Sequence, residues 1–380
     1  MEYDFDKIIE RRNTGSLKWD RYPDDKAISM WVADMDFQAP PAVLETLRKC
    51  VDYGIFGYPL PTKELAGVIT QALGQKFGWS IEPDWIVWLP CLGTGLNLAC
   101  RSVGDVDDEA ISFTPVYPPF LAAPGQSKRT LLTVPLMLRD GQYVFDLEKL
   151  KRTITAKTRL LILCSPHNPV GRVFSREELR ALAEICLEND IVICSDEIHC
   201  ELVLDEVRHI PTASLSSEIA DNTITLMSPS KTYNIPGLGC GFAIISNEKI
   251  RRNYVEAEKG ILSTPNALGY SACLAAYRDC EDWRRAVVDY LRKNREIVYD
   301  FLNNELSPLS MQKGQATYLA WIDARKLELS DPAGFFREGG VILSDGKDFA
   351  ASGFLRLNFA CPQEVLRVAL SRMKRSLTRL

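Results

Sequence analysis

A lysine flanked by hydroxyl groups is the residue of this sequence best suited to chemistry. Lys231 stands in the segment Thr223 to Asn234, TITLMSPSKTYN, just after a short apolar run that is typical of a buried strand. An ammonium is costly to bury, so a lysine there either reaches solvent or is kept partly neutral for chemistry. Ser228 and Ser230 could hold a phosphate, and a lysine amine is the usual anchor of pyridoxal phosphate. Because Ser-Lys pairs are common in surface loops, the motif alone leaves a solvated loop open.

Two more polar side chains follow apolar runs elsewhere in the chain. Asp196 comes after IVICS, where an ionised carboxylate needs a cationic or hydrogen-bonding partner. A protonated pyridine nitrogen is such a partner, and a helix cap or a turn is the alternative. Asn168 lies between two prolines in CSPHNPVG, where its bond to the next proline is a plausible cis site. Its amide could bind a ring hydroxyl, or the segment could be an ordinary turn.

An aromatic ring and an arginine complete this set of candidates. Tyr117, in TPVYPPF, could stack on a flat ring or could simply pack. Arg356, in the strand-like FLRLNFA, suits bidentate binding of a substrate carboxylate, with an exposed arginine on an edge strand as the alternative. His199 and His167 adjoin the aspartate and asparagine motifs, and His209 is expected in a surface loop. Three dispersed histidines have no metal-ligand spacing, which predicts that no metal is bound.

The elements that must position these residues follow from short apolar runs. Helical or turn segments separate several of the runs, and this alternation predicts an α/β fold with a mainly parallel central sheet flanked by helices. Ligands bind such sheets at the carboxyl ends of the strands, where the candidate residues fall. A strand that leads into a small-residue loop and a helix from Leu96 could present amides to an anion. The expected strands are Trp85 to Leu89, Ala110 to Phe113, Leu160 to Cys164, Ile191 to Cys194, Thr223 to Met227 and Gly241 to Ile245.

The chain is long enough for two domains. Its 380 residues predict an arm over residues 1–40 that contributes to a small domain, a large cofactor-binding domain over 41–280, and a small α+β domain over 281–380. Helical spacing covers Ala42 to Tyr53 and Lys63 to Phe77. Helical character from Asn266 to Leu306, broken around Asp279, should lead from the large domain into the small one.

Composition limits the partners. Hydrophobic residues make up 46% and charged residues 25%, with a net charge of -5, so we expect a globular enzyme without a nucleic-acid partner. No apolar run approaches the ~20 residues of a membrane span, and the first residues are charged, which predicts a cytoplasmic protein without a membrane partner. Eleven cysteines without a C-x-x-C pair indicate reduced core residues.

Taken together, the motifs resemble those of a known family. The chain is similar to the fold-type I pyridoxal-phosphate enzymes of the class I/II aminotransferase superfamily, and within them to the cystathionine β-lyase branch of MalY/PatB-type C-S lyases. The similarity spans nearly the whole length. The motifs that carry it, in the family's order, are MWVADMDF, FGYP, TPVYPPF, CSPHNPVGRVF, SDEIH, SPSKTYNIPGL, TYLAWID and FLRLNFACP.

The resemblance implies pyridoxal 5'-phosphate as cofactor and a role for each matching residue. Lys231 would bond the cofactor aldehyde, Asp196 would pair with the pyridine nitrogen and Tyr117 would stack on the ring, which makes these the catalytic residues. Tyr58 would reach the phosphate of the neighbouring subunit's cofactor, which implies a homodimer with shared active sites. The other implied residues are Asn168 at the ring hydroxyl and the substrate, Arg356 at the substrate carboxylate, Ser228 and Ser230 at the phosphate, and His199 at the cofactor.

The first phosphate loop departs from the family pattern. Family members usually have G-V-V-P-A-L where this chain has CLGTGL. The sequence therefore does not decide which backbone amides face the phosphate. Leu92 and Gly93 are the expected donors, and Thr94 replaces one of them if the loop shifts by one residue.

The resemblance favours one reaction over two alternatives. A C-S β-lyase would split cystathionine or a related cysteine S-conjugate into a thiol, pyruvate and ammonia. An aminotransferase of an amino acid would use the same residues. A regulatory or binding protein that keeps the fold is the third possibility, and the intact Lys231, Asp196, Asn168 and Arg356 argue against an inactive enzyme. The physiological substrate and the pathway stay open.

Overall fold

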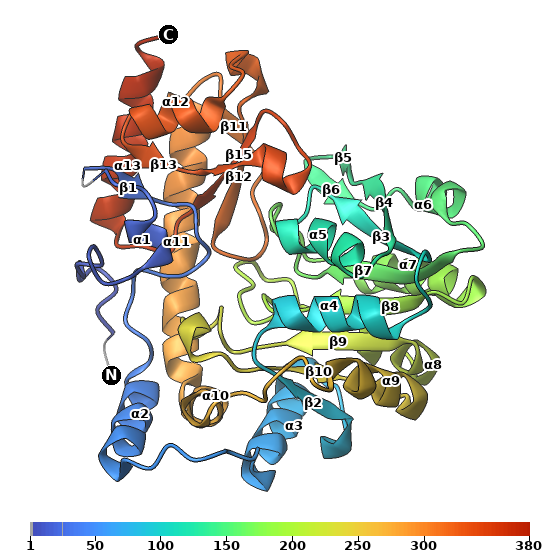
Figure 1. Ribbon diagram of the computed structural model, residues 1–380. Coiled ribbons are helices and arrows are strands. Elements are labelled where there is room, and N and C mark those ends of the chain that lie inside the picture. Colours follow the sequence, from blue (N-terminus) through green and yellow to red (C-terminus); the bar gives the residue numbers. More distant parts are fainter. Residues whose placement is uncertain (1–2, 25) are drawn as a thin grey trace.

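A seven-stranded sheet forms the centre of the computed structural model, which describes residues 3–24 and 26–380 (Figure 1). Strand β10 is antiparallel to both of its neighbours, and the remaining adjacent pairs are parallel. The predicted α/β fold with a mainly parallel sheet is therefore confirmed. In order across the sheet, the strands are β2 (Ile86–Leu89), β10 (Gly241–Ile244), β9 (Thr223–Met227), β8 (Val192–Asp196), β7 (Thr158–Cys164), β3 (Glu109–Thr114) and β4 (Thr130–Pro135).

Helices cover both faces of this sheet. In strand β7, Leu160 and Ile162 pack on one face of the sheet, while Leu161 and Leu163 pack on the other. Because both faces are buried, the sequence of this strand is mostly apolar and does not alternate with polar residues. Helices on the first face are α4 (Leu92–Ser102), α5 (Pro118–Gln126) and α9 (Glu248–Glu258). Those on the second are α3 (Lys63–Phe77), α6 (Leu147–Thr153), α7 (Arg176–Glu188), α8 (Ser217–Asp221) and α10 (Ala267–Asp279).

Two details of the large sheet differ from expectation. Helix α4 begins at Leu92, not at Leu96, because the extended backbone of Cys91 starts the helix directly after the loop. Glycine lowers helix propensity, so the glycines of this first turn concealed the start of the helix in the sequence. The packing requires glycine at position 95, because a Cβ there would lie 2.9 Å from a methyl group of Leu89. Strand β4 was not foreseen, because it lies at the sheet edge and is largely unburied.

A smaller sheet belongs to the carboxyl-terminal part of the chain. Its strands, all antiparallel to their neighbours, are β11 (Ser310–Met311), β12 (Leu319–Asp323), β15 (Phe354–Asn358) and β14 (Ser344–Asp345). The helices of this part are α11 (Glu281–Glu305), α12 (Pro332–Glu338) and α13 (Gln363–Leu377). A break at Cys280 separates α11 from α10, as the sequence predicted around Asp279. Figure 1 shows α11 as the long helix that runs between the two parts.

The amino-terminal arm packs on this smaller part. Strand β1 (Ile28–Ser29) pairs in parallel with β13 (Val341–Ile342), and Phe5 and Met30 share one apolar core with the carboxyl-terminal helices. The pairing supports the division into arm, large domain and small domain, whose boundaries stay a prediction. The other elements are α1 (Leu17–Asp20), α2 (Pro41–Tyr53), β5 (Met137–Arg139) and β6 (Gln142–Val144).

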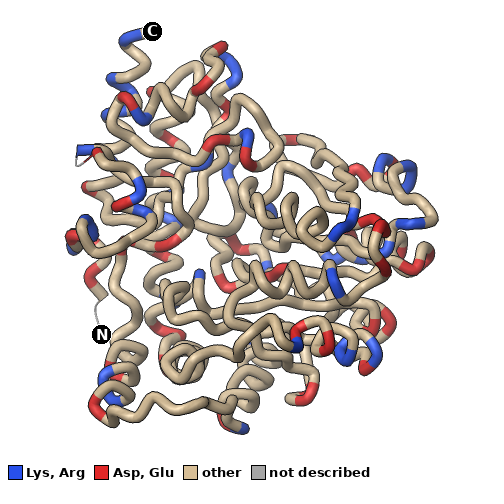
Figure 2. The backbone as a smooth tube through the Cα atoms, viewed as in Figure 1, with Lys and Arg blue, Asp and Glu red and all other residues tan. Residues whose placement is uncertain are grey.

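Charged side chains lie mainly at the periphery. Figure 2 shows lysine and arginine mixed with aspartate and glutamate along the outer helices and loops, while the strands of the large sheet are mostly uncharged. The eleven cysteines are free, and most are buried, as predicted, although Cys91 is exposed. None of the helices in the described ranges is long and apolar enough to cross a membrane.

Candidate active site

Most of the predicted site residues meet in one cavity at the carboxyl edge of the large sheet. Strands β7, β8 and β9 are parallel neighbours, so the segments that follow Cys164, Asp196 and Met227 emerge side by side. The cavity has a volume of about 260 Å³. The predicted residues that line it are Leu92, Gly93, Tyr117, Asn168, Asp196, His199, Ser228, Ser230 and Lys231.

The amine of Lys231 is poised between charged and neutral forms. Its Nζ donates to the carbonyl of Ala33 at 2.7 Å, and the hydroxyl of Tyr318 donates to the same oxygen at 3.0 Å. The pKa of Lys231 is lowered to about 8, chiefly by burial and also by the positive charge of Arg356, against the opposing effects of Asp34 and Asp196. A useful fraction of the amine is therefore neutral near pH 7, which a nucleophile or a base requires.

Asp196 lies at the end of β8 with few donors around it. Its Oδ1 accepts one bond, from the backbone N–H of Ile198 at 3.1 Å. The pKa of Asp196 is raised to about 7, chiefly by burial and also by the neighbouring Glu197, against the opposing effects of the Ile198 N–H and of Lys231. A buried carboxyl in this state gains most from a cationic partner inside the cavity.

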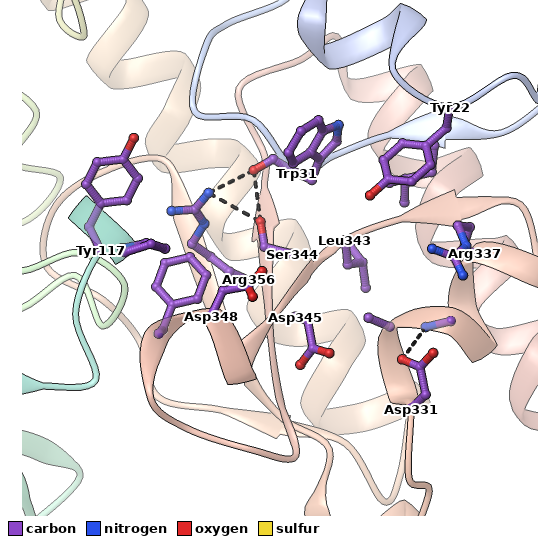
Figure 3. Close-up of a pocket in the computed structure, with 15 residues that line it drawn as sticks. Tyr22, Trp31, Tyr117, Asp331, Arg337, Leu343, Ser344, Asp345, Asp348 and Arg356 are labelled. Atoms are coloured by element: carbon purple, nitrogen blue, oxygen red, sulfur yellow. Dashed lines mark hydrogen bonds between the residues drawn. The ribbon is translucent and has the colours of Figure 1, made fainter. Parts of the chain in front are cut away.

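Arg356 and Asn168 form a buried pair beside Tyr117. Arg356 Nη1 donates to Asn168 Oδ1 at 3.1 Å, Nη2 donates to the carbonyl of Trp31 at 2.8 Å, and Tyr117 donates its backbone N–H to the Asn168 carbonyl at 3.1 Å. The Asn168 peptide bond to the following proline is cis, as considered from the sequence. Arg356 is on β15 between β12 and β14, which excludes the exposed edge-strand alternative. Figure 3 shows Tyr117 beside its guanidinium.

The start of helix α4, which also lines the cavity, is rich in backbone donors. The first N–H groups of α4, including those of Leu92 and Gly93, have no acceptor within their own helix. At Gly93 a Cβ would meet nothing within 4 Å, so the space in front of this turn is open. The hydroxyl of Ser228 donates to the Cys240 carbonyl at 2.7 Å and accepts from the Ser230 N–H at 3.2 Å. Ser230 is therefore the serine whose hydroxyl can turn into the cavity.

Two predicted site residues, Tyr58 and Arg356, are not among the residues that line this cavity, and of the two only Arg356 is bonded to a residue of its wall, Asn168. Tyr58 is fully exposed in the segment between α2 and α3. Several apolar residues in this segment and in the last turn of α2 are exposed as well, namely Val51, Tyr53, Ile55, Phe56 and Leu60.

The histidines differ from one another in setting. His199 is buried in the cavity wall, and its Nδ1 has no partner among the described residues. Burial and the charges of Lys231 and Arg356 lower the pKa of His199 to about 3, so its ring is neutral. The surface-loop expectation for His209 is wrong: it is 4% exposed, and its Nε2 lies 2.7 Å from Glu197 Oε2. The buried carboxylate of Glu197 requires a hydrogen-bond partner, and His209 provides it. The polar sequence around His209 gives no sign of this contact with a residue twelve positions earlier.

Several contacts at the site come from the amino-terminal arm and were missed from the sequence. The carbonyl of Trp31 accepts from Arg356, and the carbonyl of Ala33 accepts from Lys231. Ser344, on β14 of the small sheet, also accepts from Arg356, at 3.3 Å. Backbone carbonyls leave no side-chain signature. The unusual mixture of apolar and acidic residues in MWVADMDF was the available signal, and the sequence placed it in an arm without assigning it a role at the site.

Comparisons with known proteins agree with these observations. The family model for aminotransferase class I and II matches residues 28–373. Cystathionine beta-lyase PatB of Bacillus subtilis (strain 168) is 37% identical over 386 residues, which cover 98% of this chain and 100% of that protein. The crystal structure of OvoB has a TM-score of 0.97 at 42% identity over 99% of each chain. The crystal structure of cystalysin from Treponema denticola, which contains a pyridoxal 5'-phosphate cofactor, has a TM-score of 0.96 at 33% identity over 100% of each chain. The resemblance inferred from the motifs is thereby confirmed: the chain belongs to the aminotransferase class I and II family, in its cystathionine β-lyase branch of fold-type I pyridoxal-phosphate enzymes.

Proposed function

We propose that this protein is a pyridoxal-phosphate-dependent C-S β-lyase that cleaves cystathionine or a related cysteine S-conjugate. The observation that carries the proposal is the meeting of a partly neutral Lys231 and a buried Asp196 in one cavity. Relatives named cystathionine beta-lyase match nearly the whole chain, which favours the lyase over other reactions of the family.

The cavity fits the cofactor by the chemistry of its donors. Lys231 supplies the amine that bonds the cofactor aldehyde. The buried carboxylate of Asp196 would be stabilised by a nearby positive charge, which a protonated pyridine nitrogen provides. The start of α4 and the Ser230 hydroxyl supply neutral donors for the phosphate, where the helix dipole also favours an anion. The amide of Asn168 and the ring of Tyr117 line the same cavity.

Several residues of the cavity and its wall have separate roles in the elimination reaction. The bound cofactor supplies an electron sink for the bond pair at the substrate Cα. Arg356 binds the substrate carboxylate through its guanidinium, and Asn168 holds that guanidinium in place. The Lys231 amine removes the proton from Cα, and Asp196 keeps the ring nitrogen protonated. The thiolate leaves from Cβ, and water completes the conversion of the remaining fragment to pyruvate and ammonia.

An assay with cystathionine separates this reaction from its rivals. The holoenzyme should release pyruvate, ammonia and homocysteine in equal amounts, and Lys231→Ala should lose turnover by several orders of magnitude. Transfer of the amino group to a 2-oxo acid without free thiol would assign an aminotransferase instead. Failure to bind pyridoxal phosphate in the native protein would contradict both reactions and leave a binding role.

We also infer that two chains assemble into a homodimer with shared active sites. The exposed apolar segment that carries Tyr58 supports this, because such patches mark interaction surfaces. Tyr58 has no role at the cavity of its own chain, and its hydroxyl would complete the phosphate site of the partner. Location in the cytoplasm and the absence of nucleic-acid and membrane partners stay predictions.

A further inference from the structure

A second cavity of about 330 Å³, shown in Figure 3, adjoins the proposed active site. Tyr117 lines both cavities. Arg356 lines the second and donates to Asn168 in the wall of the first at 3.1 Å. A substrate whose carboxylate is bound by Arg356 therefore has this space available for the group that lies beyond its sulfur.

The walls of this second cavity carry an excess of negative charge. Its carboxylates are Asp331, Asp345 and Asp348, and its guanidinium groups are Arg337 and Arg356. Once the substrate carboxylate occupies Arg356, three carboxylates remain against one guanidinium. The vacant space thus favours a positively charged group.

Two of the carboxylates are available to a ligand. Asp331 caps helix α12 by accepting from the Gly334 N–H at 2.8 Å. Asp345 accepts from the Lys347 N–H at 2.9 Å, and its Oδ2 forms an ion pair with the Lys347 ammonium at 3.7 Å, a distance that leaves this oxygen without a hydrogen-bond donor among the described residues. Asp348 is exposed and has no hydrogen-bonding or ionic partner within residues 3–24 and 26–380.

Aromatic faces line the same space. The rings of Tyr22 and Trp31 meet edge to face at 5.8 Å, and the indole N–H of Trp31 donates to the Lys18 carbonyl at 3.1 Å. The guanidinium of Arg337 already lies over the Tyr22 ring, 5.7 Å from its centre. Aromatic faces attract cations, which adds to the effect of the carboxylates.

We propose that this cavity binds a cationic group on the half of the substrate that leaves as the thiol. Asp345 and Asp348 pair with the cation, and Tyr22 and Trp31 form the wall behind it. The assignment rests on the proposed lyase function and narrows its substrate to S-conjugates whose leaving half carries a positively charged group, as the homocysteine half of cystathionine does in its ammonium.

Three conjugates of similar size test the charge preference. These are S-aminoethyl-L-cysteine, S-propyl-L-cysteine and S-carboxyethyl-L-cysteine, which carry a cationic, a neutral and an anionic leaving half. The value of kcat/KM for pyruvate release should be highest for the cationic conjugate, by about tenfold over the neutral one, and lowest for the anionic one. Calorimetry of the same three compounds with the Lys231→Ala holoenzyme should give the same order of affinities.

Variants assign the preference to the two carboxylates. The double substitution Asp345→Asn and Asp348→Asn should reduce the ratio of cationic to neutral kcat/KM by about tenfold, since asparagine keeps the backbone cap of Asp345 but removes both charges. Glu338→Gln is the matched control. It removes a carboxylate from helix α12 outside the cavity and should leave the ratio unchanged.

The possible failures can be told apart. Equal kcat/KM values for all three conjugates, or an unchanged ratio in the double variant, would overturn the cation site while the lyase function stands. If no conjugate released pyruvate but binding still followed the charge order, the cavity assignment would hold and the lyase function would fall. Binding without any charge order would overturn the assignment directly.

Discussion

The protonation of Lys231 is set by residues from three separate parts of the chain. Burial favours the neutral amine and Arg356 of the small sheet adds to that effect, while Asp34 of the arm and Asp196 of the large sheet oppose it. These opposing contributions leave the pKa of Lys231 at about 8, well below its usual value. The reactivity of this amine is therefore a property of the folded chain, which the motif SPSKTYN alone could not specify.

A pH profile tests this account of Lys231. A base with a depressed pKa loses its proton as pH rises through that pKa, so the reaction of cofactor-free protein with pyridoxal phosphate should accelerate from about pH 7 and level off by about pH 9. Stopped-flow absorbance measures the rate, with Nα-acetyl-lysine as the unperturbed reference. Arg356→Gln should move the midpoint to higher pH and Asp34→Asn to lower pH. A rate that keeps rising to the pKa of free lysine in all three proteins would contradict the account.

Among the elements, those with regular apolar patterns could be predicted and those defined by distant contacts could not. The runs that became β7, β8 and β9 are buried on both faces and therefore apolar throughout, so their sequence signal was strong. The first turn of α4 was hidden by its glycines, and edge strand β4 by its exposure. At the site, the sequence could indicate side chains whose type alone suggests chemistry, such as Lys231, Asp196 and Asn168, and these line the cavity. The carbonyls of the arm and the buried pair of His209 and Glu197 were missed, because each depends on a partner elsewhere in the chain.

The start of helix α4 supports a prediction about the phosphate. Gly93→Pro removes one N–H from the first turn, where no intrahelical bond is lost, and α5 of this chain begins with two prolines. Loss of one charge-assisted bond should weaken affinity for pyridoxal phosphate by roughly 1.5 to 3 kcal/mol. Affinity for pyridoxal, which has no phosphate, should change little.

Gly93→Ala is the control for this helix. A Cβ at Gly93 meets nothing within 4 Å, and alanine keeps the N–H, so affinity for the phosphorylated cofactor should match the wild type. Equal losses for pyridoxal and pyridoxal phosphate in the proline variant would mean that the helix had moved. Unchanged affinity for both would show that this amide does not face the phosphate.

At the scale of the whole molecule, the arm, the large sheet and the small sheet each contribute to the site. Ala33 comes from the arm, Asp196 and Lys231 from the edge of the large sheet, and Arg356 from the small one. Because β1 pairs with β13, the arm is joined to the carboxyl-terminal part of the chain, which also carries Arg356. A second chain would be a fourth contributor to the site under the proposed dimer, because Tyr58 is exposed on an apolar segment away from the cavity of its own chain.

Mixed dimers test whether Tyr58 acts across a subunit boundary. Tyr58→Phe should weaken cofactor retention by roughly 1.5 to 3 kcal/mol, because a hydroxyl bonded to a phosphate is charge-assisted, without abolishing turnover at saturating cofactor. When Tyr58→Phe chains are exchanged with Lys231→Ala chains, the hybrid has one site with Lys231, and that site receives its Tyr58 from the Lys231→Ala chain. Cofactor affinity at this site should return to the wild-type value, measured by turnover against pyridoxal phosphate concentration. An active monomer in sedimentation, or a hybrid that keeps the weakened affinity, would refute the shared site.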